Sequence, residues 1–124
     1  DELDIEQKSN LRIVCEDAFT WLKDTDEKFD WIINDAFIGD QMQGRQPSFL
    51  MEVVSHLNPG GIYMENHVSA RSGFGARSLY RREKQMQEYF DSVTKIICDE
   101  DVSRFRRQNF VLTGILQEGT DGKD

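Results

Sequence analysis

The feature that most constrains the fold is a short run of large apolar residues that stops at a carboxylate. Trp31, Ile32 and Ile33 follow one another without a polar interruption, and Asp35 comes two residues later. A strand that is apolar on both faces must be covered on both, which is typical of parallel sheets in α/β proteins. In such sheets ligands bind beyond the carboxyl ends of the strands. The run therefore predicts a buried strand over residues 29–34, with Asp35 at a ligand-binding edge.

Strand and helix patterns alternate along the chain. The expected strands cover residues 11–15, 29–34, 61–66, 92–98 and 109–116, and the expected helices cover residues 18–23, 47–57 and 78–90. The last two strands follow each other too closely for a crossover helix, so we expect them to be antiparallel. This order predicts an α/β fold in which the sheet is mostly parallel with an antiparallel last strand, and helices lie on both faces.

Local signals support the boundaries of the helices. Asp17 can cap the helix over residues 18–23. Asn58, Pro59 and two glycines follow the helix that begins at Pro47, as expected where a helix ends. In the last helix, we expect Leu79, Met86 and Phe90 to face inward, and Arg81, Arg82, Glu83 and Lys84 to face largely outward.

The charge of the chain restricts its partners. The formal net charge is −8, and an acidic chain has no electrostatic reason to seek nucleic acid or anionic lipid. No apolar run approaches the roughly 20 residues of a membrane span. We therefore expect neither a nucleic-acid partner nor a membrane. The acidic first residues also lack the basic start of a signal peptide.

The cysteines and histidines indicate no disulfide and no metal site. Cys15 and Cys98 both fall in strand-like apolar runs, where a single thiol is typically a small buried hydrophobe. Free thiols of this kind suit the reducing cytosol, so we expect a cytoplasmic protein. His56 and His67 are far apart, and neither has a Cys or His three or four residues away, so no metal is predicted.

The length of 124 residues allows one domain, or part of one, but not two. Residues 1–10 are a polar lead-in, and residues 117–124 are predicted to be a disordered tail. The folded part is expected over residues 11–116.

Three segments within that part carry a resemblance to a known family. They are Glu16-Asp17-Ala18-Phe19 after the first strand, the Phe29–Asp35 run, and Leu57-Asn58-Pro59-Gly60-Gly61-Ile62. Together with the terminal antiparallel hairpin, they resemble the C-terminal half of a class I S-adenosylmethionine-dependent methyltransferase domain. Within that superfamily the spacing is most similar to the spermidine synthase-like branch, which includes aminopropyltransferases and methyltransferase-like relatives.

The resemblance implies a transferase whose cofactor is S-adenosylmethionine or decarboxylated S-adenosylmethionine, with a small-molecule substrate such as an amine. It places Asp17 at the adenine amino group and Ala18 against the ring. Asp35 would be catalytic, because a carboxylate can orient an attacking amine and take up its proton. The implied cofactor-binding set is completed by Glu16 and Asn34, and the implied substrate-lining residues are Asp40, Asn66 and His67.

The chain also departs from the family pattern. The family's Gly-rich cofactor loop and ribose-binding acid are absent, so the resemblance implies a truncated domain that is inactive by itself. The second acid of the synthase motif is replaced by Ile38, although Asp40 lies close. Residues 104–108 replace the loop that lines the polyamine pocket, so methyl and aminopropyl transfer both stay open. The strand over residues 11–15 would lose its neighbours, so we expect it to pair again, to stay loose or to bury its edge in a homodimer.

Other functions are compatible with parts of the pattern. The first is a non-catalytic α/β module that acts by dimerisation or partner binding. A response-regulator-like domain with Asp35 as phosphoacceptor is disfavoured, because no acidic pair precedes it. The Gly73–Gly75 stretch beside Arg71 and Arg77 resembles a phosphate cradle only weakly, and a lid beside the site is the more natural interpretation.

Overall fold

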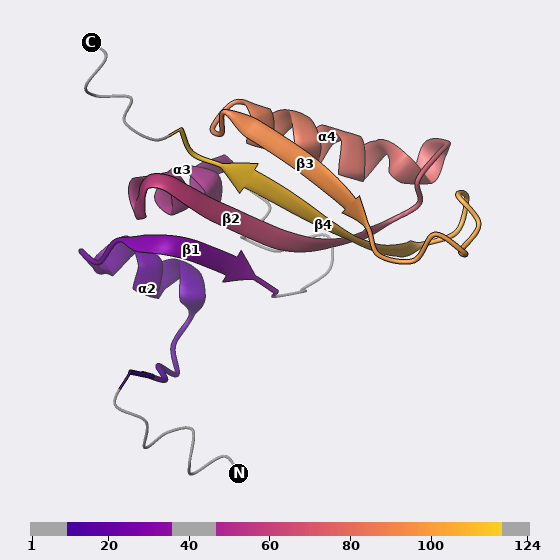
Figure 1. The fold of residues 1–124 in the computed structure, drawn as a ribbon. Helices are drawn as coiled ribbons and strands as arrows, with labels where there is room; N and C mark the ends of the chain where they lie inside the picture. The colour runs from indigo at the N-terminus through magenta and orange to yellow at the C-terminus, as the bar shows by residue number, and fades with distance from the viewer. Residues whose placement is uncertain (1–9, 36–46, 118–124) are drawn as a thin grey trace.

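The computed structural model describes residues 10–35 and 47–117 (Figure 1). Several predictions concern positions outside the described residues. These are the candidate substrate residue Asp40, the Ile38 position, nearly all of the predicted lead-in and the tail beyond residue 117. Among the described helices, none is long and apolar enough to cross a membrane.

Four strands form one mixed sheet in the order β1-β2-β4-β3. They are β1 (Phe29–Asn34), β2 (Leu57–Ser69), β3 (Ser92–Ile97) and β4 (Gln108–Ile115). β1 and β2 are parallel, whereas β4 lies antiparallel between β2 and β3. The predicted α/β class and the antiparallel last strand are confirmed. The expectation of a mostly parallel sheet with an antiparallel last strand is also confirmed, because β1, β2 and β3 all run in one direction and, among the described strands, β4 alone runs in the other.

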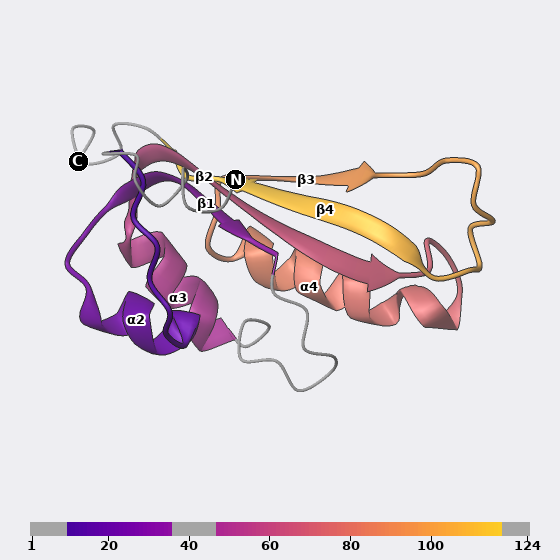
Figure 2. The same cartoon turned by 90° about the horizontal axis from the view of Figure 1, so that it is seen from below.

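In the part of the chain that the structure describes, three helices cover one face of this sheet. They are α2 (Ala18–Asp24), α3 (Pro47–Ser55) and α4 (Arg77–Gln87), and a short 3-10 turn, η3 (Phe74–Ala76), precedes α4. Figure 2 shows all three helices on the same side of the strands. The hydrophobic core fills the space between them and the sheet, and its most buried apolar side chains include Leu50, Val53, Tyr63, Leu79, Met86, Phe110 and Leu112.

The opposite face of the sheet carries no described helix, which corrects the expectation of helices on both faces. Trp31 and Ile33 of β1 point to this uncovered face and are 57% and 64% exposed. Ile32, between them, packs against the core. Successive side chains of a strand alternate between faces, so the apolar run that predicted two-sided burial is buried on one side.

The predicted strand over residues 11–15 is not a strand. All five residues are exposed, and this segment pairs with none of the described strands. Of the three outcomes expected for it, pairing with a described strand is not seen, and the segment is loose within this chain. Burial of its edge in a homodimer stays a prediction. Cys15 is exposed because it lies in this loose segment, and Cys98 is exposed because it lies beyond the end of β3. The prediction that both thiols are buried is therefore wrong.

The turn from α3 into β2 is bonded to the end of α2 and to the start of β1, where Phe29 N donates to His56 O at 2.7 Å. The side chain of His56 bridges backbone carbonyls, with Nδ1 2.7 Å from Glu52 O and Nε2 2.8 Å from Thr25 O. Gly60 has a φ of 82°, a conformation that glycine adopts without strain. A Cβ at Gly61 would lie 2.8 Å from Asn58 O. The Gly-Gly pair that predicted a helix end is thus required by the tight entry into β2.

Candidate functional site

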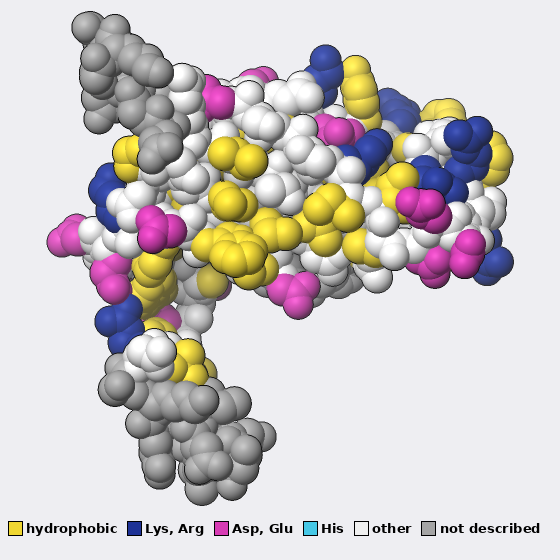
Figure 3. All heavy atoms as spheres, viewed as in Figure 1, with side chains coloured by type: hydrophobic (Ala, Val, Ile, Leu, Met, Phe, Trp, Pro, Cys, Tyr) yellow, Lys and Arg dark blue, Asp and Glu magenta, His cyan; other side chains and the backbone are white. Residues whose placement is uncertain are grey.

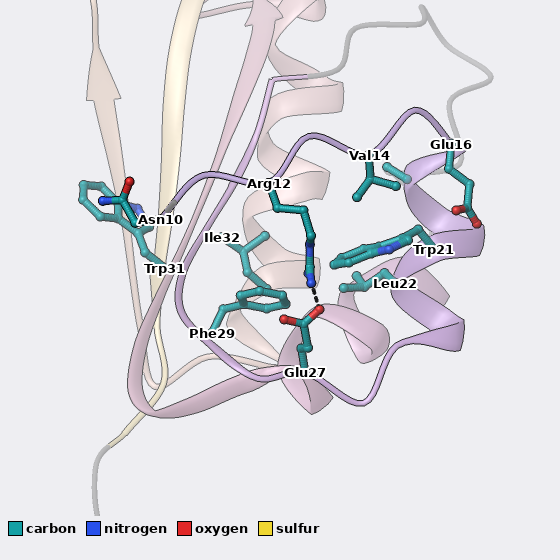
Figure 4. A pocket seen from close by; sticks show the side chains of 11 residues that line it. Asn10, Arg12, Val14, Glu16, Trp21, Leu22, Glu27, Phe29, Trp31 and Ile32 are labelled. Atoms are coloured by element: carbon teal, nitrogen blue, oxygen red, sulfur yellow. Dashed lines mark hydrogen bonds and ion pairs between the residues drawn. The ribbon is translucent and has the colours of Figure 1, made fainter. Parts of the chain in front are cut away.

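A hollow of about 580 Å³ lies between residues 10–16, α2 and β1 (Figure 4). Its size falls within the range of small-molecule sites, about 300–1,000 Å³. It is lined by Asn10, Arg12, Val14, Glu16, Ala18, Trp21, Leu22, Glu27, Phe29, Trp31 and Ile32. These residues come from the loose segment, from α2 with the turn that follows it, and from β1, so the hollow exists because the segment does not pair with the strand.

Aromatic rings form much of the wall of the hollow. The ring centroids of Trp21 and Phe29 are 6.2 Å apart, and the guanidinium of Arg12 lies 6.0 Å from the centre of the Trp21 ring. Arg12 also forms an ion pair with Glu27 across the opening. Both charged side chains are largely in water, so the pair adds little stability. The hollow can accept a flat apolar group beside a charged rim.

The structure brings two of the four predicted cofactor residues to this hollow and leaves the other two, and the predicted catalytic residue Asp35, outside its lining. Glu16 and Ala18 line it, as Figure 4 shows for Glu16. Asp17, Asn34 and Asp35 are not among the lining residues. The cofactor roles of the four residues and the catalytic role of Asp35 stay predictions.

Asp17 caps α2, which confirms the predicted N-cap. Its Oδ2 accepts a hydrogen bond from Thr20 N at 2.9 Å and another from Thr20 Oγ1 at 3.0 Å. These bonds, the backbone one first, lower the pKa of the Asp17 carboxyl. One oxygen of the predicted adenine-binding carboxylate is therefore already engaged by the helix.

Asp35 and Asn34 occupy the carboxyl end of β1. Asp35 is exposed directly after the strand, which is the position that the sequence predicted for it. The side chain of Asn34 is half-buried, and its Nδ2 donates to Tyr63 Oη at 3.1 Å. The two neighbouring residues thus differ in environment, because one faces water and the other is held by β2.

Behind Asn34 lies a buried polar chain that sequence reasoning missed. Tyr63 Oη donates to Glu65 Oε1 at 2.7 Å. Arg82 of α4 donates to the same carboxylate twice, from Nε to Oε2 at 2.7 Å and from Nη2 to Oε1 at 2.8 Å. The side chains of Arg82 and Glu65 are 2% and 5% exposed. The expectation that Arg82 faces outward is wrong, because it lies on the buried face of α4 together with Leu79 and Met86.

Two signals in the sequence could have found this pair. Glu65 alternates with Tyr63 and His67 along one strand, so a buried strand face would contain a carboxylate that needs a cation. Arg82 is three residues after Leu79, and residues three apart share a helix face. These signals indicate that Glu65 needs a cation and that Arg82 is one candidate, but only the packing of α4 on β2 shows that the two meet.

The buried chain shifts the acidity of its members. Burial first, and the negative charge of Glu65 second, raise the pKa of the Tyr63 hydroxyl well above its usual value. Burial by itself lowers the pKa of Arg82, but the hydrogen bonds and charge of Glu65 offset that effect, so its pKa is raised. Tyr63 is thus neutral and Arg82 is charged.

The two substrate-lining candidates that lie in β2 face opposite sides of the sheet. His67 is 1% exposed and lies on the helix-covered side with Tyr63 and Glu65. Asn66 is exposed on the other side. β2 continues to Ser69, so neither residue is in the loop after the strand. Their predicted substrate roles stay predictions.

The loop before α4 is tied to the turn between β3 and β4. The backbone N–H groups of Arg71 and Ser72 donate to Arg104 O at 2.8 and 3.1 Å, and Arg71 Nη2 donates to Val102 O at 2.9 Å. Ser69 Oγ donates to Gly75 O at 2.7 Å. These bonds hold the predicted lid in place against the arginine-rich turn.

Comparison with known structures identifies the fold. A probable spermidine synthase from Corynebacterium glutamicum ATCC 13032 superposes with a TM-score of 0.69 at 25% identity, and the match covers 84% of this chain and 37% of that one. A methyltransferase from Pyrococcus furiosus reaches a TM-score of 0.53 at 18% identity, covering 75% of this chain and 43% of that one. The M1.HpyAVI–SAM complex reaches 0.54 at 16% identity, covering 86% of this chain and 53% of the other. The last two comparisons show a shared fold alone.

The chain therefore spans 37% of the length of the synthase that it resembles. No curated protein matches it. The sequence profile of the spermine/spermidine synthase domain matches residues 2–99, which is more than half of the 124 residues. The predicted resemblance is thus confirmed, and this chain belongs to the spermine/spermidine synthase domain family.

Proposed function

We propose that this chain is the part of a spermidine synthase-like transferase that holds one side of a cofactor site. The cofactor would be S-adenosylmethionine or its decarboxylated form. The observation that carries the proposal is the family match over residues 2–99. It is supported by the carboxylate of Asp35 at the end of β1, where ligands of such sheets bind.

The residues around the hollow fit the adenosine part of such a cofactor. Ala18 leaves space at the start of α2, Trp21 and Leu22 supply an apolar wall, and Glu16 supplies a hydrogen-bond acceptor at the rim. When bound, the cofactor would supply the methyl or aminopropyl group that is transferred.

Asp35 is the residue that we assign to the acceptor. It is exposed at the end of β1, so a small amine could approach its carboxylate from water. A carboxylate there would orient the amine and accept its proton as the new bond forms. Asp40, Asn66 and His67 stay proposed as substrate residues by the family resemblance, although Asn66 and His67 face opposite sides of β2. The free thiols of Cys15 and Cys98 are exposed, which favours a reducing compartment such as the cytoplasm.

Calorimetric titration of the chain with S-adenosylmethionine and with methylthioadenosine tests the cofactor proposal. Wild type is expected to bind, and Ala18→Trp is expected to lose binding because the larger side chain fills the hollow. Asp26→Asn, an exposed carboxylate in the turn after α2, is the control that should bind normally. The proposal fails if wild type binds neither compound, or if Ala18→Trp binds as wild type does.

A second candidate function, self-association, is favoured by the uncovered face of the sheet. β1 is an outer strand of the described sheet, so its edge offers unpaired backbone groups to another strand. Trp31 and Ile33 are exposed beside that edge, and Figure 3 shows hydrophobic side chains gathered over the middle of this face. Two copies of β1 paired antiparallel would place Trp31 of one opposite Ile33 of the other, and such apolar cross-strand pairs are stabilising.

Sedimentation velocity tests this second function. Wild type is expected to sediment as a dimer, and Ile33→Lys as a monomer, because a charge on the paired face disfavours edge association. Ile13→Lys is the matched control, since Ile13 is 60% exposed but lies outside the sheet. A monomeric wild type at high concentration would rule the dimer out.

A further inference from the structure

We propose that the buried ion pair of Glu65 and Arg82 acts through Tyr63 as a positioning device for the end of β1. Its target is the side-chain amide of Asn34, the residue directly before Asp35. This inference rests on the proposed function in one respect, namely that Asp35 is the carboxylate that needs to be positioned.

The direction of each hydrogen bond follows from the ion pair. Arg82 donates two hydrogen bonds to the carboxylate of Glu65 in a buried ion pair, and a carboxylate paired in this way can only accept. The Tyr63 hydroxyl therefore uses its one proton to donate a hydrogen bond to Glu65 Oε1. The Tyr63 oxygen is left to accept, so the Asn34 group that faces it must be the NH₂ and not the carbonyl oxygen.

A charge in α4 thus determines which way an amide points in β1. Side-chain amides have two nearly isosteric orientations, and their hydrogen-bond network decides between them. Glu65→Gln removes the obligatory acceptor, so the Tyr63 hydroxyl could then donate to Asn34 and the amide could turn over. The natural pair excludes that alternative.

The surroundings keep this chain of bonds rigid. Tyr63 is 0% exposed and Glu65 is 4% exposed. The Tyr63 ring stacks on Phe90, with centroids 5.9 Å apart and an interplanar angle of 5°. Arg82 Nη1 also donates to Gln85 Oε1 at 3.1 Å. Buried polar groups with satisfied partners specify one arrangement, so the Asn34 amide is held at a fixed place beside Asp35. Tyr63, Glu65 and Arg82 are positioning residues, because none of them touches the proposed substrate.

Nitrogen-edited NMR of the whole chain tests the device directly. The side-chain NH₂ of Asn34 is expected to give two well-separated signals, because one of its protons is hydrogen-bonded to Tyr63 Oη. The same bond should slow the exchange of that proton with water. In Tyr63→Phe these signals should move and exchange at least severalfold faster, and the backbone amide of Asp35 should shift with them. Tyr63→Phe keeps the ring that stacks on Phe90, so the core stays filled.

Tyr80→Phe is the matched control, because Tyr80 is 62% exposed on α4 and its loss should leave the Asn34 signals in place. Glu65→Gln should move the Asn34 signals even though Tyr63 is intact. Unchanged Asn34 and Asp35 signals in a folded Tyr63→Phe protein would overturn the positioning role. If Glu65→Gln does not fold, the Tyr63→Phe result decides alone.

Cofactor titration of the same variant separates the two proposals. If wild type binds S-adenosylmethionine, and Asn34 contributes to that site as the family resemblance implies, Tyr63→Phe should weaken binding by about two- to tenfold, the factor that one hydrogen bond represents. Equal affinity in Tyr63→Phe would overturn the link between the device and the site. If wild type does not bind the cofactor, the proposed function fails, while the Asn34 signals still report whether the device exists.

Discussion

The two faces of the sheet are built from the same strands but differ in what they bury: one covers a charged pair, and the other exposes large apolar side chains. On the face that the helices cover, a carboxylate is buried and Arg82 satisfies it with two hydrogen bonds. On the other face, Trp31 and Ile33 remain in water although they belong to an unbroken apolar run. The difference teaches that burial here follows the placement of the helices and not the hydrophobicity of the strand.

The largest expected effect comes from breaking the buried ion pair. Arg82→Ala leaves Glu65 buried without its cation, and such a loss typically costs about 3–5 kcal/mol in the free energy of unfolding. Urea unfolding measures it. The control is Arg81→Ala, an exposed neighbour on α4, which should change stability by less than about 0.5 kcal/mol. Similar losses in both variants would mean that the covered face does not depend on the pair.

A matched pair of truncations in α3 tests whether burial is confined to one side. Leu50 is 0% exposed and Met51, its neighbour, is 58% exposed. Leu50→Ala should cost about 2–5 kcal/mol because it leaves a cavity in the core. Met51→Ala should stay within about 0.5 kcal/mol. The same urea titration compares them, and a large loss in Met51→Ala would indicate that something covers that surface in solution.

High pH should weaken the covered face through Tyr63. Its pKa is raised in the folded state, so the stability that it contributes is fully present below the unfolded pKa of about 10. That stability is lost as the pH rises from there toward the folded pKa. Compared with wild type, Tyr63→Phe should therefore become relatively more stable above pH 10, as measured by thermal unfolding. Tyr80→Phe, which removes an exposed hydroxyl, should show no such gain.

Acid should produce the smallest effect, at the cap of α2. The pKa of Asp17 is lowered in the folded state, so its contribution is present above the unfolded pKa and is lost as the pH falls through the folded one. Wild type should therefore be more stable than Asp17→Ala near neutral pH, and the two should converge in strong acid. Circular dichroism at 222 nm during thermal unfolding can follow this. If wild type stays more stable than Asp17→Ala after the carboxyl is protonated, the stability comes from contacts of the neutral Asp17 side chain with Thr20 and not from its charge.

Much of the fold could be predicted because its signals are local. The cap at Asp17 lies within three residues of the group that it bonds, and the strand over residues 29–34 appears with the same bounds. The antiparallel β3–β4 pair followed from the short connection between them. For the candidate site, Asp35 was placed at the end of its strand, and Glu16 and Ala18 line one hollow.

The parts that could not be predicted depend on partners far away in the chain. Arg82 was expected in solvent because the pattern of a helix contains no information about its partner, Glu65, which lies 17 residues earlier on a strand. Residues 11–15 have the composition of a strand, yet a strand needs a neighbour to bond to, and none of the described strands pairs with them. Cys15 became exposed with that segment.

The sequence by itself determined the order of the helices and the four described strands, which residue caps α2, and to which family the chain belongs. These depend largely on residues close together in the chain. Only the tertiary structure decided which face of β1 is buried, that Arg82 turns inward, and that the amide of Asn34 points to Tyr63. The physical reason is that burial and hydrogen-bond direction are properties of pairs of groups. Those pairs are formed when α4 closes over β2.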